Sequence, residues 1–144
     1  SPGRSPQPLP IGAHLTGVAI CYEIIYPALV REFVLRGSEL LTTITNDAWY
    51  GRSAAPHQHF QQATMRAIEQ GRYLVRAANT GISGVVDPYG RVLVRGELFE
   101  TEAITHDVRL LTGLTLYGHI GDLLAYLCLV FTLAWVLAAW RIRS

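Results

Sequence analysis

The chain has 144 residues, of which half are hydrophobic and 16% are charged, a length that suffices for one domain with its own core. Its formal net charge of +1 gives no electrostatic basis for binding nucleic acid, so no such partner is expected. The two cysteines, Cys21 and Cys128, are too few for the disulfide framework of a small secreted domain, and we expect no bond between them.

The N-terminal part of the sequence predicts an irregular segment and then a strand-to-helix turn. Residues 1–14 hold four of the seven prolines and show no apolar periodicity. Val18–Ile20 is typical of a strand buried on both faces, and Pro27 is typical of the first turn of a helix that Gly37 ends. Cys21 therefore lies at a turn where α/β enzymes commonly present a nucleophile, although a free cysteine also packs well as a small hydrophobic residue.

A second strand and an aromatic loop follow. The β-branched run Leu40–Thr45 predicts a strand, and the loop after it, Asn46–Gly51, carries Trp49 and Tyr50 side by side. Since ligands of open α/β sheets bind beyond the carboxyl ends of the strands, these aromatic residues could form a pocket wall beside the cysteine. The alternative is that the loop folds both rings onto the core.

A long apolar face with helical spacing predicts one continuous helix from Phe60 to Ala78. Within it, Glu69 and Arg72 are spaced to form an ion pair on the helix surface. His57 and His59 lie at its start without an acidic or cysteine partner at ligand spacing, so a helix-start role is favoured over a metal site, and no metal is expected.

The next part predicts a β-hairpin. Ile82–Val86 and Arg91–Val94 flank Asp87–Gly90, which has the proline and glycine of a tight turn, and Glu102–Val108 could add a further strand. The order of strand, helix, strand, helix and then several strands predicts a layered α/β domain.

Leu123–Trp140 has eighteen residues without a formal charge, and a helix of that length spans about 27 Å, close to the thickness of the bilayer hydrocarbon. The alternative of a buried core helix is disfavoured, because this apolar run ends in Arg141 and Arg143. By the positive-inside rule the tail of residues 141–144 is cytoplasmic and the α/β domain lies on the other side of the membrane.

With these features the sequence resembles the apolipoprotein N-acyltransferase family, bacterial inner-membrane enzymes whose extracytoplasmic domain belongs to the nitrilase, or carbon-nitrogen hydrolase, superfamily. The resemblance extends from about Leu15 to the C-terminus. It rests on short motifs, namely Ile20–Glu23 (ICYE), Thr45–Gly51 (TNDAWYG), His59–Gln61 (HFQ) before Met65–Ala67 (MRA), Asn79–Ile82 (NTGI) and Thr112–Thr115 (TGLT).

The resemblance implies transfer of a fatty acyl chain from a phospholipid, through a cysteine thioester, to the N-terminal amine of an apolipoprotein, with no cofactor. Cys21 would be the nucleophile and the backbone N–H of Tyr22 an oxyanion donor, while Glu23 would orient the pocket. Asn46, Trp49 and Tyr50 would contact the substrates.

The family uses a Glu-Lys-Cys triad, yet this sequence has no lysine, and no glutamate precedes Cys21. The expected fold is therefore α/β, the C-terminal part of a nitrilase-like α-β-β-α sandwich followed by one transmembrane helix, with the rest of the enzyme as partner. Such a chain is expected to be inactive alone and to expose a sheet edge. The expected boundaries are residues 15–112 for the catalytic part, 113–121 for a connection and 122–140 for the span. The alternatives are a membrane-tethered amidase of the same superfamily and a non-catalytic membrane-anchored module.

Overall fold

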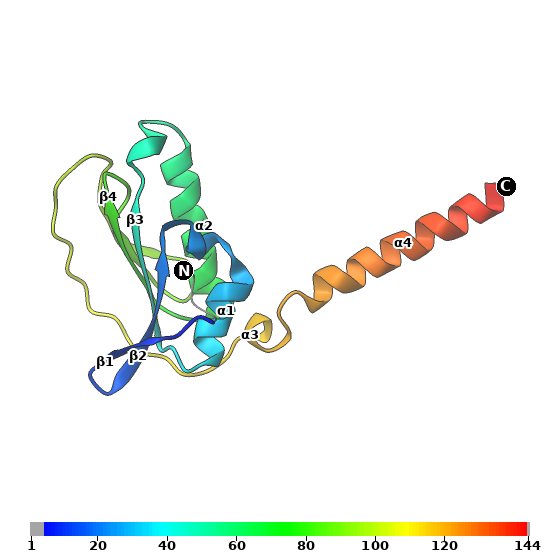
Figure 1. Cartoon of the computed structure of the whole chain (residues 1–144), viewed down its shortest axis with the longest axis horizontal. Coiled ribbons are helices and arrows are strands. Elements are labelled where there is room, and N and C mark those ends of the chain that lie inside the picture. Colours follow the sequence, from blue (N-terminus) through cyan, green and yellow to red (C-terminus); the bar gives the residue numbers. More distant parts are fainter. Residues whose placement is uncertain (1–4, 144) are drawn as a thin grey trace.

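The structure is a computed structural model that describes residues 5–143. Its centre is one six-stranded mixed sheet in the order β1-β2-β3-β4-β5-β6 (Figure 1). The strands are β1 (Leu9–Ile11), β2 (His14–Ile20), β3 (Leu40–Asn46), β4 (Leu74–Asn79), β5 (Gly84–Val86) and β6 (Val92–Arg95).

The three central strands β2, β3 and β4 run parallel, so their carboxyl ends meet at one edge of the sheet. Ile20 pairs with Ile44, and Asn46 pairs with Asn79, so the segments that follow these strands are neighbours in space. The outer strands β1, β5 and β6 are antiparallel to their neighbours.

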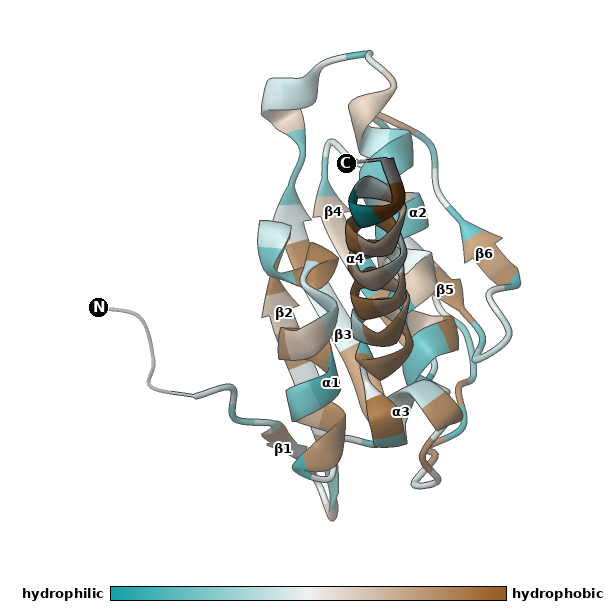
Figure 2. Ribbon diagram, turned by 90° about the vertical axis from the view of Figure 1, so that its right-hand side faces the viewer, coloured by the Kyte–Doolittle hydropathy of each residue, from teal (hydrophilic) through white to brown (hydrophobic). Residues whose placement is uncertain are grey.

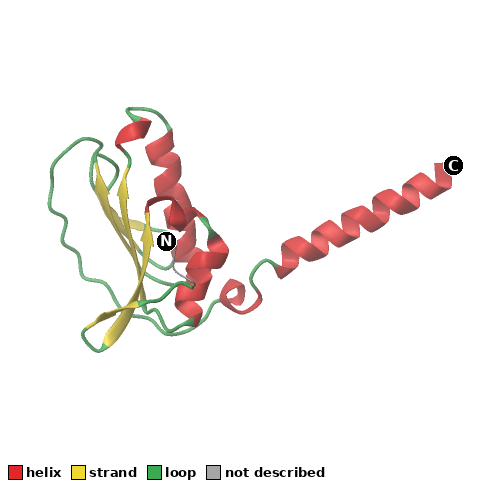
Figure 3. Ribbon diagram, in the orientation of Figure 1, coloured by secondary structure: helices red, strands yellow, loops and turns green. Residues whose placement is uncertain are grey.

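The helices α1 and α2 cover one face of the sheet, as Figure 3 shows, and the core lies between these helices and the sheet. Ala19 of β2 and Leu41 of β3 pack there with Val30 of α1 and Ala63 of α2. The helical elements are η1 (Cys21–Ile25), α1 (Pro27–Leu35), η2 (Ala48–Tyr50), α2 (Ala55–Gln70), α3 (Leu116–Ile120) and α4 (Leu123–Arg143).

The opposite face of the sheet is only partly covered. Because side chains alternate along a strand, Ile20 and Ile44 point away from the helices, and they remain 58% and 46% exposed. Residues 96–115 run along part of this side without a helix or strand (Figure 1). The sheet therefore presents paired apolar side chains opposite its helical layer.

The predicted helix from Phe60 to Ala78 is wrong in its second half. Helix α2 ends at Gln70 because Gly71 adopts the left-handed conformation, with φ of 61°, and β4 begins three residues later. The apolar spacing continued by coincidence into β4, in which Leu74 and Arg76 point inward at a period of two. Because the inward-pointing Arg76 is charged, the sequence does not show the alternation of apolar and polar residues that is typical of a strand.

Three smaller predictions also differ from the structure. Glu69 pairs with Arg66 on its own helix, at 2.6 Å between Oε1 and Nη2, since Arg72 lies beyond the helix end. Glu102–Val108 forms no strand, although the structure describes all of these residues. The proline-rich start contains the short edge strand β1, while residues 1–4 lie outside the described part of the chain.

Strand β2 ends at Ile20 as predicted, but it is not buried on both faces, because Ile20 is 58% exposed on the face away from the helices. The other elements agree with the sequence-based predictions. Helix α1 begins at Pro27, β3 covers the β-branched run, and β5 and β6 form the expected hairpin. Helix α4 extends away from the sheet (Figure 1) and is hydrophobic along most of its length (Figure 2). The span Leu123–Ile142 has a mean hydropathy of 2.2 and no buried residue, so it is long and apolar enough to cross a membrane and does not act as a core helix here.

Candidate active site

Cys21 occupies the predicted strand-to-helix turn. Strand β2 ends at Ile20, Cys21 opens the 3₁₀ turn η1, and α1 follows at Pro27. The cysteine has a φ of 52°, a conformation that costs a residue with a side chain about 1–2 kcal/mol. It is a free thiol and partly exposed. A strained, accessible thiol at the carboxyl edge of a parallel sheet fits a nucleophile better than a packing residue.

Glu23 fixes the shape of this turn. Its Oε2 accepts a hydrogen bond of 2.7 Å from the backbone N–H of Ile20, directly before the cysteine. The neighbouring Tyr22 is half exposed, and its ring meets that of Tyr26 edge-on with centroids 6.0 Å apart. The carboxylate of Glu23 and the ring contact between Tyr22 and Tyr26 therefore fix the backbone on both sides of Cys21.

The loop after β3 lies beside the cysteine turn, as the parallel register requires. The Oδ1 atom of Asn46 accepts a 3.1 Å hydrogen bond from the N–H of Ala48, which shapes the turn η2. Trp49 is 78% exposed, so it does not fold onto the core, whereas Tyr50 is partly buried with its ring 6.3 Å from that of His59.

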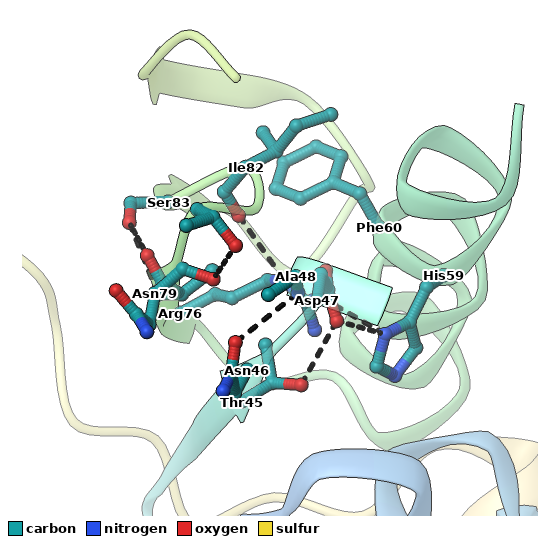
Figure 4. A network of polar contacts seen from close by, with 12 residues as sticks. Thr45, Asn46, Asp47, Ala48, His59, Phe60, Arg76, Asn79, Ile82 and Ser83 are labelled. Atoms are coloured by element: carbon teal, nitrogen blue, oxygen red, sulfur yellow. Dashed lines mark hydrogen bonds and ion pairs between the residues drawn. The ribbon is translucent and has the colours of Figure 1, made fainter. Parts of the chain in front are cut away.

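A buried group of charged and polar side chains lies below these two turns, and we call Asp47, His59 and Arg76 the charge cluster. Figure 4 shows His59 and Arg76 converging on Asp47 from α2 and β4. Arg76 Nη2 donates to Asp47 Oδ2 at 2.8 Å, and both side chains are fully buried. His59 Nδ1 lies 3.0 Å from Asp47 Oδ1, which also accepts from Thr45 Oγ1 at 3.0 Å.

The cluster is incompletely satisfied. Arg76 Nε donates to the carbonyl of Ile82 at 3.1 Å, but its Nη1 has no hydrogen-bond partner among the described residues, and neither has His59 Nε2. A nitrogen that donates to Asp47 cannot also accept from Arg76, so the 3.1 Å approach of Arg76 Nη2 to His59 Nδ1 is a contact and not a second hydrogen bond.

The electrostatics of the cluster extend to the cysteine. Burial raises the pKa of Asp47, but the hydrogen bond from His59 and the charge of Arg76 outweigh this effect and bring it below its usual value. Burial lowers the pKa of Arg76, whereas the negative charges of Asp47 and of a Cys21 thiolate oppose that change. Burial and the charges of Asp47 and Cys21 raise the pKa of Tyr50, so its phenol stays protonated at neutral pH.

The structure thus brings Cys21, Tyr22, Glu23 and Tyr50 together and leaves Trp49 in solvent. The charge cluster is not predicted from the sequence as a unit, and His59 was predicted only to have a helix-start role. The sequence signal that could have indicated the cluster is Arg76, a charged residue within an otherwise apolar run that is typical of a strand. A cavity of about 650 Å³ lies near the start of β4, at the end of the sheet opposite Cys21. It is lined in part by Arg72, Tyr89 and Leu114 and does not include Cys21.

Comparisons with known families agree with this geometry. The sequence model of the family described as carbon-nitrogen hydrolase matches residues 2–113. The chain is 40% identical over 144 residues to an apolipoprotein N-acyltransferase of Geobacter metallireducens, which covers all of this chain and 28% of that protein. It is 46% identical over 109 residues to an apolipoprotein N-acyltransferase of Shewanella oneidensis, covering 76% of this chain and 21% of that protein. The chain therefore spans about a quarter of the length of these relatives.

Solved structures show the same fold. A carbon-nitrogen hydrolase from Helicobacter pylori matches with a TM-score of 0.59 at 19% identity, covering 67% of this chain and 41% of that one. A variant of the amidase from Nesterenkonia sp. AN1, in which acrylamide has added to the active-site cysteine, matches with a TM-score of 0.55 at 25% identity, covering 67% and 40%.

Proposed function

Because the chain belongs to the carbon-nitrogen hydrolase family, we propose that it is the nucleophile-bearing part of an apolipoprotein N-acyltransferase. The observation that carries the proposal is the strained, accessible Cys21 at the carboxyl edge of the sheet, in a chain 40% identical over its full length to such an enzyme. The acyl donor is a phospholipid, and the acceptor is the N-terminal diacylglyceryl-cysteine amine of an apolipoprotein.

The proposed reaction has two steps. A base takes the proton of the Cys21 thiol, the thiolate attacks the ester carbonyl of the phospholipid, the ester C–O bond breaks, and the lysophospholipid oxygen leaves with the proton that the base held. The acceptor amine then attacks the thioester, the C–S bond breaks and the amine loses a proton to a base, which yields the amide and returns the thiolate. The backbone N–H of Tyr22 stabilises the oxyanion in both steps, and Glu23 holds the turn that presents this donor.

In this proposal the triad glutamate and lysine come from the part of the enzyme outside this chain. The exposed apolar pair Ile20 and Ile44 supports such a partner, because a second sheet packed there would bury both side chains. The chain covers about 40% of the two solved family structures, which leaves room for that layer. We propose that the isolated chain is inactive until this layer is supplied.

We further propose that α4 crosses the bacterial inner membrane with the α/β domain on the extracytoplasmic side. Its apolar length and its lack of buried residues support the span, and the arginines at its end support the orientation. Trp49, Tyr50 and Asn46 would then contact the acyl chains or the acceptor, and the exposure of Trp49 suits such a role. The bilayer delivers the donor to the active site.

The test uses membranes that contain this chain together with the remaining N-terminal region of the Geobacter metallireducens relative. A phospholipid with an alkyne-tagged acyl chain should give a hydroxylamine-labile label on the chain. Cys21→Ala should abolish the label, while Cys128→Ala, on the exposed face of α4, should keep it. A label that persists in Cys21→Ala would refute the proposed nucleophile, and the absence of a label in every sample would refute the acyl-enzyme.

The alternative of a membrane-tethered amidase rests on the likeness to the Nesterenkonia amidase, and a non-catalytic anchored module would need no thioester at all. Adding a diacylglyceryl-cysteine peptide to the labelled chain separates these functions. An acyltransferase moves the label to the peptide amine, an amidase releases it as free fatty acid at the same rate with or without peptide, and a non-catalytic module never acquires it.

A further inference from the structure

We propose that the cavity near the start of β4 binds a phosphate group, carried by a phospholipid headgroup or free in solution. The cavity has a volume of about 650 Å³ and lies at the end of the sheet opposite Cys21. The inference goes beyond the proposed acyl transfer, since neither step of that reaction uses this cavity. Only the choice of a lipid as the source of the phosphate rests on the proposed membrane span.

The first observation is a buried cation in the wall of the cavity that has no carboxylate partner. Arg72 is 2% exposed, and its Nε and Nη1 donate to backbone carbonyls, with those of Ser38 and Gly113 at 2.9 and 2.6 Å. Within residues 5–143 it forms no ion pair, and its Nη2, which is not fully enclosed, has no hydrogen-bond partner. Since a guanidinium has five N–H donors, the two on Nη2 remain available to a ligand.

The surroundings of Arg72 compensate only part of its charge. Its Nη1 also lies 3.3 Å from the carbonyl oxygen of Gln70, the last residue of α2, and a helix C-terminus carries roughly half a negative charge. Burial lowers the pKa of Arg72, and the charge of Glu39 opposes this change without outweighing it. The Glu39 carboxylate itself lies 2.8 Å from His14 Nδ1. An anionic ligand would supply the counter-ion that a buried charge requires.

Two further arginines line the same cavity and keep donors free. The side chain of Arg109 is exposed and has no bonded partner among the described residues. Arg91 bonds to Asp87 through Nε, which leaves both of its terminal nitrogens unbonded within that part of the chain. Asp87 is the one acidic residue among the described residues of the lining, so three arginines give the lining a net charge of +2. The fork of an arginine matches phosphate oxygens, which makes phosphate the favoured anion.

The walls between these arginines are largely apolar. Ile68, Leu111 and Leu114 line the cavity, and Tyr89 in the hairpin turn is 78% exposed. Its volume of about 650 Å³ is in the range of small-molecule sites, and a few charges within apolar walls suit an amphiphile better than an inorganic ion. Exposed tyrosine and arginine side chains are also typical of protein surfaces at the headgroup level of a membrane.

The cavity lies at the end of the domain that leads into α4. Thr115 lines the cavity and caps α3 by accepting a 2.9 Å hydrogen bond from the N–H of Gly118. The span begins eight residues after Thr115, at Leu123. Arg31 of α1 holds α3 through 2.9 Å hydrogen bonds to the carbonyls of Gly118 and His119, and Figure 1 shows α4 leaving the domain from α3. A membrane crossed by α4 would therefore bring phospholipid headgroups near the cavity.

The experiment titrates the full chain, isotopically labelled and in a neutral detergent, and follows backbone amides by NMR. The probes are dihexanoylphosphatidylglycerol, inorganic phosphate and, as an uncharged control, dihexanoylglycerol, all at constant ionic strength. We expect saturable shifts of the amides of Tyr89, Arg109 and Leu114 with the phospholipid and none with dihexanoylglycerol. The amide of Arg95, which lies outside the cavity, should not shift.

Arginine variants separate the cavity from a general attraction to positive charge. Arg109→Gln should weaken binding of the phospholipid about three- to tenfold, and the double variant with Arg91→Gln more than tenfold, because each change removes one cation beside the phosphate. The matched control is Arg95→Gln, which removes an exposed arginine outside the cavity and should change the affinity less than twofold. Arg72→Met should abolish binding. If that variant does not fold, the two exposed arginines of the cavity still provide the test.

Binding of the phospholipid at least tenfold tighter than that of inorganic phosphate supports a headgroup site, and equal affinities support the site with free phosphate as its ligand. The absence of a saturable shift with both phosphate compounds overturns the proposal, as does an equal loss of affinity in the Arg109 and Arg95 variants.

The titration reads amides far from Cys21 and requires no thioester, so its result is separate from that of the acyl-labelling test. A missing acyl label together with saturable binding would refute the proposed function alone. A thioester label without binding at the cavity would refute the phosphate site alone.

Discussion

Loss of the Asp47 charge should destabilise the domain far more than loss of an exposed partner in a similar ion pair. In Asp47→Asn the fully buried guanidinium of Arg76 loses its counter-ion, and Asp47 no longer offers carboxylate oxygens to His59 and Thr45. Breaking a buried pair from one side costs about 3–5 kcal/mol. With a urea dependence of about 2 kcal/mol per M, the unfolding midpoint should fall by about 2 M.

The comparison variant is Arg91→Ala. Arg91 Nε lies 2.6 Å from Asp87 Oδ2, a shorter contact than the 2.8 Å between Arg76 and Asp47, but the Arg91 side chain is 72% exposed. Asp87 also keeps its hydrogen bonds from the backbone N–H groups of Tyr89 and residue 91. Loss of this pair should cost less than about 1 kcal/mol.

The assay is urea unfolding of the full chain in detergent, followed by far-UV circular dichroism, in which the micelle-bound α4 contributes a constant signal. A midpoint for Asp47→Asn that falls no further than that of Arg91→Ala would refute the reasoning, because burial would then not decide the strength of these two pairs.

Three further outcomes follow from the same contacts. The pKa of Asp47 is lower in the folded chain than in the unfolded one. The ionised Asp47 side chain therefore stabilises the fold fully above about pH 4, and this stabilisation is lost as the pH falls through the lowered pKa. Acid titration should reduce the stability of the wild type more steeply than that of Asp47→Asn. A Cβ on Gly81 would lie 2.5 Å from Asp47 Oδ2, so Gly81→Ala should cost about 1–3 kcal/mol in thermal unfolding, while Gly113→Ala, with open space around it, should cost less than about 1 kcal/mol. Trp49→Ala should change stability by less than about 0.5 kcal/mol, since the side chain is 78% exposed, yet it should slow acyl labelling if it contacts substrate.

The local parts of the fold could be predicted because their signals are local. The turn at Cys21 lies between a short apolar run and Pro27, and the hairpin is encoded by the turn Asp87–Gly90. Strand β1 was missed because proline is tolerated on an edge strand and still weakens the strand pattern. The end of α2 had a usable signal in Gly71, which the accidental apolar spacing beyond it concealed.

The candidate site was predictable only in its linear motifs. Cys21, Tyr22 and Glu23 are adjacent in the chain, so one motif predicts all three as candidate site residues. Asp47 and Arg76 are 29 residues apart and meet only through the parallel pairing of β3 with β4. No sequence spacing predicts that two residues so far apart will meet. A single arginine in a predicted strand is expected to be exposed, and only the packing of α2 against the sheet shows that Arg76 is buried.

The positive φ of Cys21 has a consequence for how this chain could evolve. Glycine adopts that conformation without steric penalty, so a chain selected only for a long-lived fold would gain about 1 kcal/mol by replacing the cysteine with glycine. Any drift towards greater stability at this position thus removes the thiol. Under the proposed function, a locally strained residue directly after β2 is retained because the reaction needs its thiol, at the expense of some stability.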